Sequence, residues 1–523
     1  MSGPGAHQSG ATMSGLTLAA LARFQDRIAF SSGSGSLSYR QTASLIGRYQ
    51  YCFDRLGLTR GDVVALLGGN RAEAWCAGAA ALASGLAVTW LHPLGSVADQ
   101  LHQLQDSGAR LLVVDETRFA ARGGELGPGC ADLAIRQITL GPSGLAPDLA
   151  TLAADAPAAS PRDLAAPTDL ANIGYTGGTT GTPKGAFRTH RSNVAVATQI
   201  LAGFELPAVP KFLAVAPISH AAGTKVVPTL IRGGTVHLVT GFDPGAVAAV
   251  IARERIDTTL LVPTMIHRLI DDPDAAGADL SSLRLVLYGA APISPQLLDA
   301  GLGRLGPVFG QMFGQTECYP ITMLRRDDHR PGDPDLLRST GFPLPGTTVE
   351  VRDTAGSVLP AGEVGELWVR SPAAMDGYWR RPELTAETIV DGHLRTGDLA
   401  RIDERGYVHL VDRASDMIIS GGFNVYPRAV EDALTAHPQV GAAAVYGVPD
   451  PRWGEAVTAT VVRGPAATVT ADELRAHVRA LQGPVPTPRT IDFTDALPLT
   501  ALGKVDKKAL RARHTASPDS ARP

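Results

Sequence analysis

Lysine is scarce in this 523-residue chain: six of its 47 basic residues are lysines, and the others are arginines. Cysteine is scarcer still. The four cysteines are far apart and form no Cys-x-x-Cys pair, which argues against a disulfide framework and against a structural zinc site. The net charge of −4 gives no electrostatic basis for binding nucleic acid. We therefore expect no nucleic-acid partner.

Long apolar runs are also lacking. The longest uncharged stretch, Ala74–Leu91, is rich in Ala and Gly, and Gly85 divides it into a helix and a short strand. The first ten residues, MSGPGAHQSG, lack the basic and apolar regions of a secretory signal. We therefore expect a cytoplasmic protein without a membrane span. A composition of 44% hydrophobic residues is enough for a sizeable core.

Apolar runs typical of buried strands alternate with helical patterns through most of the chain. The expected strands are 63–67, 110–114, 212–216, 258–262 and 283–288, and the expected helices between them include 38–56, 97–105 and 244–253. This alternation predicts an α/β fold. Residues 346–412 contain short strands separated by turns, which predicts a β-rich subdomain. We expect a large N-terminal domain of layered α/β sheets with this subdomain, followed by a small, mobile α+β C-terminal domain.

The predicted boundaries follow these changes of pattern. The N-terminal domain spans 15–412, a hinge spans 413–416 and the C-terminal domain spans 417–510. Small, polar or Pro-rich residues at 1–14 and 511–523 predict flexible tails.

A glycine-rich segment, YTGGTTGTPKG, occupies residues 175–185 after an apolar stretch. Its glycines allow close backbone approach, its threonine hydroxyls can donate hydrogen bonds and Lys184 adds a positive charge, so it can bind phosphate oxygens. A Walker A loop is excluded, because Pro183 precedes the lysine and Gly185 follows it. A flexible linker is the structural alternative.

This segment resembles the phosphate loop of the adenylate-forming superfamily, which includes acyl-CoA synthetases, peptide-synthetase adenylation domains and beetle luciferases. Further motifs follow in the family's order, and the resemblance spans residues 15–510. These motifs are Gly289–Pro292, Phe313–Glu317, Thr396–Asp398, Asp412–Arg413, Asp416–Pro427 and Leu499–Lys508.

The resemblance implies a site for ATP and Mg²⁺. Phe313 would stack on adenine, Thr316 would contact the α-phosphate and Glu317 would hold Mg²⁺, while Asp398 and Arg413 would bind the ribose. Lys184, Thr316, Glu317 and Lys504 are the expected catalytic residues. The other expected nucleotide-binding residues are Thr176, Gly177, Gly178, Thr179, Thr180, Gly181, Gly289, Ala290, Ala291 and Gly314.

The resemblance also implies a pocket for the carboxylic acid, with His220 as the candidate polar group; a structural histidine in the core is the alternative. Met312 stands where relatives often have glycine, which would shorten the pocket and favour an aryl or small-to-medium acid. The expected lining residues are His220, Ala291, Met312, Gly314, Pro320 and Ile321.

The expected reaction has two steps. A carboxylate attacks the α-phosphorus of ATP to give an acyl-adenylate and pyrophosphate, and coenzyme A then takes the acyl group and releases AMP. Rotation about Ser415, where many relatives carry Lys or Asp, would withdraw Lys504 and bring Gly421 and Gly422 to the channel for coenzyme A.

Other readings stay open. The acceptor could instead be an amine, a free-standing carrier protein or a small inorganic nucleophile such as nitrite. A luciferase-like monooxygenase and a non-catalytic nucleotide-binding protein are less favoured, the latter because the expected site residues are all present. A homodimer is an open alternative to a monomer.

Overall fold

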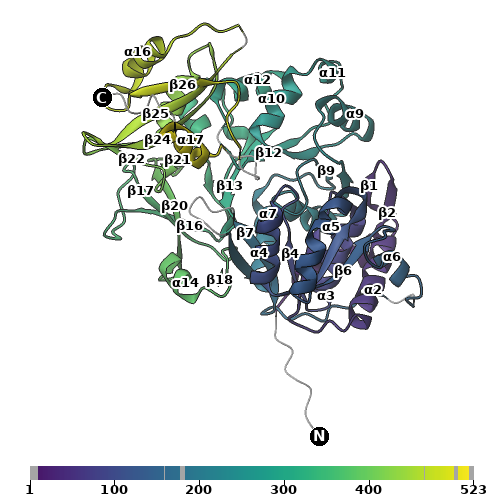
Figure 1. Cartoon of the computed structure of the whole chain (residues 1–523). Helices are drawn as coiled ribbons and strands as arrows, with labels where there is room; N and C mark the ends of the chain where they lie inside the picture. Colours follow the sequence, from purple (N-terminus) through teal and green to yellow (C-terminus); the bar gives the residue numbers. More distant parts are fainter. Residues whose placement is uncertain are drawn as a thin grey trace. The chain divides into compact units, whose positions relative to one another are not determined.

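The computed structural model describes residues 10–157, 160–176, 183–291, 293–464, 466–499 and 505–516 (Figure 1). The chain forms two compact units. The first contains residues 1–348 and 369–394, and the second contains residues 349–368 and 395–523. Within the described residues, no helix has both the length and the apolar character needed to cross a membrane.

A seven-stranded sheet in the first unit carries the end of the predicted phosphate loop. Its order is β18-β8-β7-β4-β3-β5-β6, with the five strands from β7 to β6 parallel and β8 and β18 antiparallel at one edge. The strands are β3 (Val63–Leu67), β4 (Ala87–Trp90), β5 (Ala109–Asp115), β6 (Arg136–Leu140), β7 (Leu170–Thr176), β8 (Lys184–Thr189) and β18 (Gly377–Tyr378).

Both faces of this sheet are covered, as its continuous apolar strands require. Along β3, Val64 and Leu66 pack in the same cluster as Trp75 of α3 (Ala72–Ala83). The alternate residues of β3 face the other side and pack with Leu104 of α4 (Val97–Ser107) and Leu126 of α5 (Glu116–Asp132). The sequence VVALL is therefore buried at every position.

A second sheet of nine strands completes the first unit. Its order is β15-β14-β13-β12-β11-β9-β10-β1-β2, with antiparallel strands at both edges and parallel strands between them. The strands are β1 (Ile28–Ser32), β2 (Gly35–Ser38), β9 (Lys211–Ala214), β10 (Thr235–Leu238), β11 (Thr258–Leu261), β12 (Leu285–Gly289), β13 (Phe309–Gln315), β14 (Cys318–Leu324) and β15 (Phe342–Pro343).

The two sheets share one core cluster. Phe212 and Leu287 of the nine-stranded sheet pack in the same cluster as the inner residues of β3, together with helices such as α2 (Tyr39–Arg55) and α7 (His190–Gly203). The other face of the nine-stranded sheet packs on α9 (Pro244–Glu254), α10 (Pro263–Asp271) and α12 (Pro295–Leu305). The first unit is therefore built of layered α/β sheets, as predicted.

The second unit is richer in strands. One sheet contains β16 (Thr348–Arg352), β17 (Gly365–Arg370) and β20 (His393–Ile402), with β21 (Val408–Arg413) antiparallel to β20. The other sheet has the order β23-β22-β25-β24, with β26 beside β25. Its strands are β22 (Ile418–Ser420), β23 (Phe423–Val425), β24 (Val440–Asp450), β25 (Gly454–Arg463) and β26 (Thr490–Thr494).

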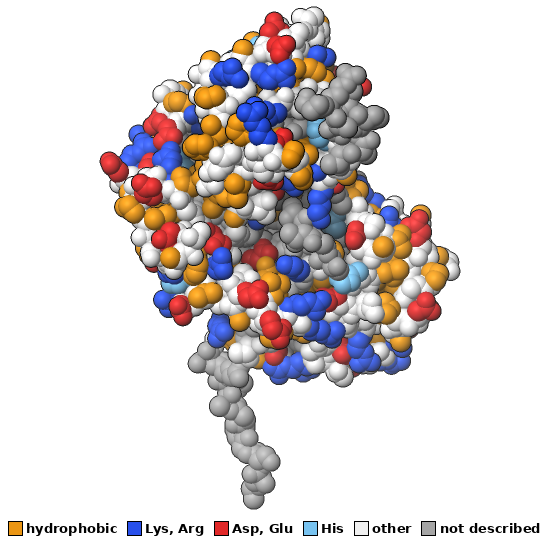
Figure 2. Space-filling model, turned by 60° about the vertical axis from the view of Figure 1, so that its left-hand side comes forward, with side chains coloured by type: hydrophobic (Ala, Val, Ile, Leu, Met, Phe, Trp, Pro, Cys, Tyr) orange, Lys and Arg blue, Asp and Glu red, His pale blue; other side chains and the backbone are white. Residues whose placement is uncertain are grey.

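Two helices cover the sheet that contains β24. Val430 and Leu434 of α15 (Pro427–Thr435) pack with Leu474 and Val478 of α16 (Ala471–Gln482). Thr470 begins α16 with a capping box to Glu473, as expected for a Thr-x-x-Glu sequence. The terminal helix is α17 (Lys507–Ala516). On the face shown in Figure 2, basic and acidic side chains are interspersed, in keeping with a net charge near zero.

Candidate active site

The β7–β8 hairpin presents both ends of the glycine-rich loop. Thr176 ends β7 and pairs with Lys184, which begins β8. Below this pair, the Tyr175 hydroxyl donates to the Asp106 carboxylate at 2.7 Å, which fixes the stem to α4. The predicted phosphate-binding residues Gly177, Gly178, Thr179, Thr180 and Gly181 lie outside the described residues.

A tight turn between β13 and β14 carries Thr316 and Glu317. It lies between the paired residues Gln315 and Cys318, so the two site residues follow β13 directly. The Glu317 backbone oxygen accepts a hydrogen bond from the Met375 amide at 2.6 Å. A Cβ atom on Gly174 would come within 3.2 Å of Thr316 Cγ2, which shows how closely β7 approaches this turn.

Tyr378 lies between Lys184 and Glu317. Its hydroxyl donates to Glu317 Oε1 at 2.8 Å. The Lys184 Nζ atom lies 5.9 Å from the centre of the Tyr378 ring, within the range of a cation–π interaction. The structure therefore brings together three predicted site residues that are up to 133 positions apart, and it adds Tyr378, which the sequence analysis missed.

Arg188 is the second residue that the sequence analysis missed. It is buried on β8, where its Nη2 atom donates to the Thr316 backbone oxygen at 2.7 Å and its Nε atom donates to the Ala373 oxygen at 3.4 Å. Burial lowers its pKa, and the nearby Glu317 and Asp376 carboxylates oppose this effect. Arg188 and Lys184 are four residues apart on one strand and therefore share a face, which is a signal that could have revealed Arg188.

The fit of Mg²⁺ can be judged from Glu317. Its Oε1 atom accepts from Tyr378, and among the described residues no donor engages Oε2. Within the same part of the chain, Glu317 belongs to no group of three ligating side chains. One half-buried carboxylate is a suitable ligand for an ion that takes its other ligands from nucleotide phosphates and water.

The end of β12 is tightly packed against β13. Gly289 pairs with Met312, and a Cβ atom on Gly289 would lie 2.3 Å from the Met312 oxygen, so a larger residue is excluded. Ala290 follows with φ of 66°, in the left-handed region, and it is exposed together with Ala291. The strand therefore ends in small residues, as expected where a flat ring approaches the backbone.

His220 lies beyond the end of β9. Its Nδ1 atom lies 2.7 Å from the Ser219 hydroxyl, and its ring packs edge-on against His92 at 4.7 Å between centroids. Burial lowers its pKa to about 4, and the neighbouring His92 acts in the same direction. His220 is therefore a neutral hydrogen-bonding group at pH 7. The other expected pocket residues Met312, Pro320 and Ile321 are buried on β13 and β14.

The predicted ribose-binding residues lie on neighbouring strands of the second unit. Asp398 on β20 pairs in register with Arg413 on β21, and the Arg413 Nε atom lies 2.6 Å from Asp398 Oδ1. Arg413 is 45% exposed, whereas Asp398 is 7% exposed. The aspartate is therefore held in place, and the guanidinium is accessible. Ser415, the predicted hinge residue, lies in an exposed turn two residues later.

Gly421 and Gly422 form a two-residue hairpin turn between β22 and β23, with φ values of 61° and 83°. A turn with positive φ at both central residues favours glycine at each. A Cβ atom on Gly421 would also lie 2.8 Å from the Trp453 ring. Lys504, the predicted catalytic lysine, lies outside the described residues.

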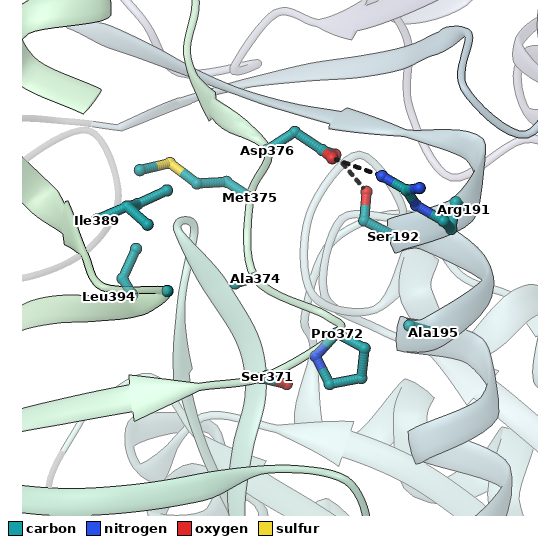
Figure 3. A pocket seen from close by; sticks show the side chains of 11 residues that line it. Arg191, Ser192, Ala195, Ser371, Pro372, Ala374, Met375, Asp376, Ile389 and Leu394 are labelled. Atoms are coloured by element: carbon teal, nitrogen blue, oxygen red, sulfur yellow. Dashed lines mark hydrogen bonds and ion pairs between the residues drawn. The ribbon is translucent and has the colours of Figure 1, made fainter. Parts of the chain in front are cut away.

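A separate pocket of about 310 Å³ lies beside the segment that supports Glu317 (Figure 3). The Asp376 carboxylate accepts from the Ser192 hydroxyl at 2.7 Å and lies near Arg191, while Met375 and Ile389 form another side. The Met375 amide donates to the Glu317 backbone oxygen, and the Ala373 oxygen accepts from Arg188. This pocket therefore adjoins the back of the candidate site.

Comparison with known proteins decides the family. Residues 18–379 match the family described as AMP-binding enzyme, and residues 429–504 match the AMP-binding enzyme C-terminal domain. The chain belongs to the AMP-binding enzyme family. The predicted membership in the adenylate-forming superfamily is thus confirmed.

This AMP-binding enzyme is 40% identical over 512 residues to the medium/long-chain-fatty-acid–CoA ligase FadD8 of Mycobacterium tuberculosis, with 95% of this chain and 89% of the relative covered. It is 38% identical over 485 residues to a feruloyl-CoA synthase of an Amycolatopsis species, with 92% and 94% covered.

Among solved structures, the AMP-binding enzyme resembles the amide bond synthetase McbA from Marinactinospora thermotolerans, with a TM-score of 0.87 and 36% identity over 95% of this chain and 99% of that chain. ATP-bound MatB from Rhodopseudomonas palustris matches with a TM-score of 0.87 and 30% identity, covering 96% and 99%. The predicted α/β class is confirmed. The roles of individual site residues and the domain boundaries stay predictions.

Proposed function

We propose that this AMP-binding enzyme is an acid–CoA ligase, which converts an aryl or small-to-medium carboxylic acid to an acyl-adenylate and then to an acyl-CoA thioester with release of AMP. The observation that carries the proposal is that Lys184 and Glu317 both contact Tyr378, with Thr316 next to Glu317 in the β13–β14 turn. The name of the feruloyl-CoA synthase supports an aryl acid, and the names of the feruloyl-CoA synthase and the medium/long-chain-fatty-acid–CoA ligase both support coenzyme A as the acceptor.

The first step brings a carboxylate toward a polyanion, so positioning and charge neutralisation carry the catalysis. Lys184 would bind phosphate oxygens from the end of the glycine-rich loop. Arg188 would fix the backbone at Thr316 and add positive charge beneath it. Glu317 would hold Mg²⁺ against the phosphates, where the ion neutralises charge. No protein nucleophile is needed.

For the second step, we propose that the predicted C-terminal domain rotates about Ser415. The exposed turn around Ser415 can absorb the change in backbone angles. The Gly421–Gly422 hairpin would then border the channel of coenzyme A. Lys504 would act in the first step only.

The test is a panel of aryl and straight-chain acids incubated with ATP and Mg²⁺, scored for pyrophosphate and AMP with and without coenzyme A. We expect rapid AMP formation only when coenzyme A is present, and an acyl-CoA detectable by mass spectrometry. Failure to release pyrophosphate with any acid would refute acid activation. Robust turnover of palmitate without turnover of benzoates or cinnamates would refute the proposed acid size.

An amine acceptor is the second candidate. The observation that favours it is the TM-score of 0.87 to an amide bond synthetase at 36% identity. Adding a panel of amines in place of coenzyme A separates the two functions, because an amide product would form without coenzyme A.

A further inference from the structure

Lys225 is a fully buried lysine that the expected mechanism does not use. It ends the short helix η1 (Gly223–Lys225) and has no exposed surface. Within the described part of the chain no carboxylate pairs with it, and burial lowers its pKa well below the ordinary value. Burying a lysine without a counter-ion costs free energy, because the amine must give up its charge and its hydration, so a structural role alone does not explain why lysine stands here.

The surroundings of the Lys225 amine are a group of neutral oxygen atoms. Its Nζ atom lies 2.9 Å from the Ala221 backbone oxygen and 3.1 Å from the Thr224 hydroxyl, and it contacts the Tyr319 hydroxyl. These contacts give the amine hydrogen-bond partners in the free enzyme, and a substrate oxygen would replace one of them. They supply no negative charge, because burial also raises the pKa of Tyr319 and keeps its hydroxyl protonated.

Flat and apolar groups complete the surroundings. The Nζ atom lies 4.5 Å from the centre of the Tyr319 ring and 5.6 Å from that of the Phe204 ring. The Met312 sulfur lies 3.4 Å from Nζ and 2.9 Å from the Tyr319 hydroxyl. Aromatic rings and a thioether suit an aryl group, and the amine suits an oxygen atom at the end of that group.

Met312 contacts Lys225 and lies on β13, the strand that ends next to Thr316, where the phosphates are expected. Met312 precedes Gln315 by three residues on β13, which is about 10 Å along a strand. The Tyr319 ring follows the same strand, because a Cβ atom on Gly314 would lie 2.8 Å from its Cδ2 atom. If the acid lies along β13 with its carboxylate near Thr316, its far end reaches the region of Met312 and Lys225.

We propose that Lys225 determines acid specificity by pairing with an ionisable oxygen, phenolic or carboxylic, at the far end of the substrate. This inference rests on the proposed function. A negatively charged oxygen on the substrate would raise the pKa of Lys225 again and favour its charged form, whereas an acid that ends in hydrogen brings no such charge. A site that is built to bind a polar group discriminates strongly against the analogue that lacks it.

The test compares three acids that share one carbon framework and differ at position 4: cinnamate, 4-hydroxycinnamate and 4-carboxycinnamate. Hexanoate and adipate form a second, straight-chain pair. Acid-dependent ATP–pyrophosphate exchange gives kcat/KM for the wild type, Lys225→Met and Lys225→Gln. Lys211→Met is the matched control, since the Lys211 amine donates to the Glu254 backbone oxygen on the exposed surface. Thermal midpoints show whether each variant is folded.

We expect the wild type to favour at least one oxygen-bearing acid over its unsubstituted partner by tenfold or more. Lys225→Met should reduce that ratio to within threefold and leave the unsubstituted acid within threefold of the wild type. Lys225→Gln should keep part of the preference for the phenol and none for the second carboxylate, because an amide can donate a hydrogen bond but carries no charge.

Equal losses on all acids in folded Lys225→Met and Lys225→Gln would overturn the proposal and leave a structural role. A wild type without a preference for either oxygen-bearing acid would also overturn it. These results are distinct from failure of the proposed function, in which the wild type would show no exchange with any acid.

Discussion

Replacing Tyr378 with phenylalanine tests the geometry around Glu317 with the smallest possible change. The substitution keeps the ring that lies 5.9 Å from Lys184 Nζ and removes only the hydroxyl that donates to Glu317 Oε1 at 2.8 Å. Tyr378 is 9% exposed and Glu317 is half-buried, so water replaces that donor only in part. The carboxylate would lose its orientation, whereas the cation–π contact would stay.

The expected loss of rate follows from the strength of the hydrogen bond between Tyr378 and Glu317. A hydrogen bond to a charged group contributes about 1.5–3 kcal/mol, which corresponds to about tenfold to hundredfold in rate. Because Glu317 is only half-buried, solvent compensates in part and the lower value applies. We therefore expect kcat/KM for ATP, measured by pyrophosphate exchange, to fall about tenfold. The Mg²⁺ concentration that gives the half-maximal rate should rise.

The assay is pyrophosphate exchange with a saturating acid, measured across a Mg²⁺ titration. Tyr51→Phe is the matched control, because its hydroxyl lies 3.4 Å from the Arg55 guanidinium at an exposed position. A folded Tyr378→Phe variant with the rate and the Mg²⁺ dependence of the wild type would refute the role of this hydrogen bond.

Four further predictions concern other parts of the chain. Arg188→Met should lower the thermal midpoint and reduce exchange by about 10²-fold, because the backbone oxygens of Thr316 and Ala373 lose their donor; unchanged exchange would contradict the role of Arg188. Gly421→Val should slow thioester formation while sparing pyrophosphate exchange, because its φ of 61° and the nearby Trp453 ring both exclude a side chain; equal loss of both steps would contradict this. Lys504→Ala should abolish acid-dependent pyrophosphate release but largely spare the use of a pre-made acyl-adenylate, and parallel loss of both would overturn that division. Burial lowers the pKa of His329 to about 4, so the unfolded chain binds the proton first and stability should fall as the pH drops from 7 toward 4, by about 2 kcal/mol at pH 5 from this group; the drop in thermal midpoint between pH 7 and 5 should be smaller in His329→Gln.

Much of the fold could be predicted because local patterns and packing agree. The run Val63–Leu67 is a central strand buried on both faces, so its apolar sequence has no interruption and its ends coincide with the observed strand. The helix expected at 244–253 is observed as Pro244–Glu254, because proline begins it and its apolar residues Val247 and Ile251 pack in the core. The strand expected at 283–288 is instead Leu285–Gly289, since strand ends depend on neighbouring strands.

The site residues that escaped prediction depend on contacts between distant segments. Arg188 reaches a backbone oxygen 128 positions away, and Tyr378 reaches a carboxylate 61 positions away. Nothing in the sequence near Lys225 shows that Tyr319 and Met312 contact its amine. The spacing from Lys184 places Arg188 on the same face of β8, but spacing carries no signal for the distant partners of Arg188, Tyr378 and Lys225. Contiguous motifs such as Phe313–Glu317 can be identified without such partners.

The β13–β14 hairpin also has a consequence for engineering the specificity of this enzyme. Within ten consecutive positions of this hairpin, Met312, Pro320 and Ile321, which are expected to line the acid pocket, flank Thr316 and Glu317, which are expected to bind the α-phosphate and Mg²⁺. A library that varies Met312 or Tyr319 therefore strains the strand that positions Thr316. Phe204 and Thr224 lie on separate elements next to Lys225, so randomising them is the safer route to new acids.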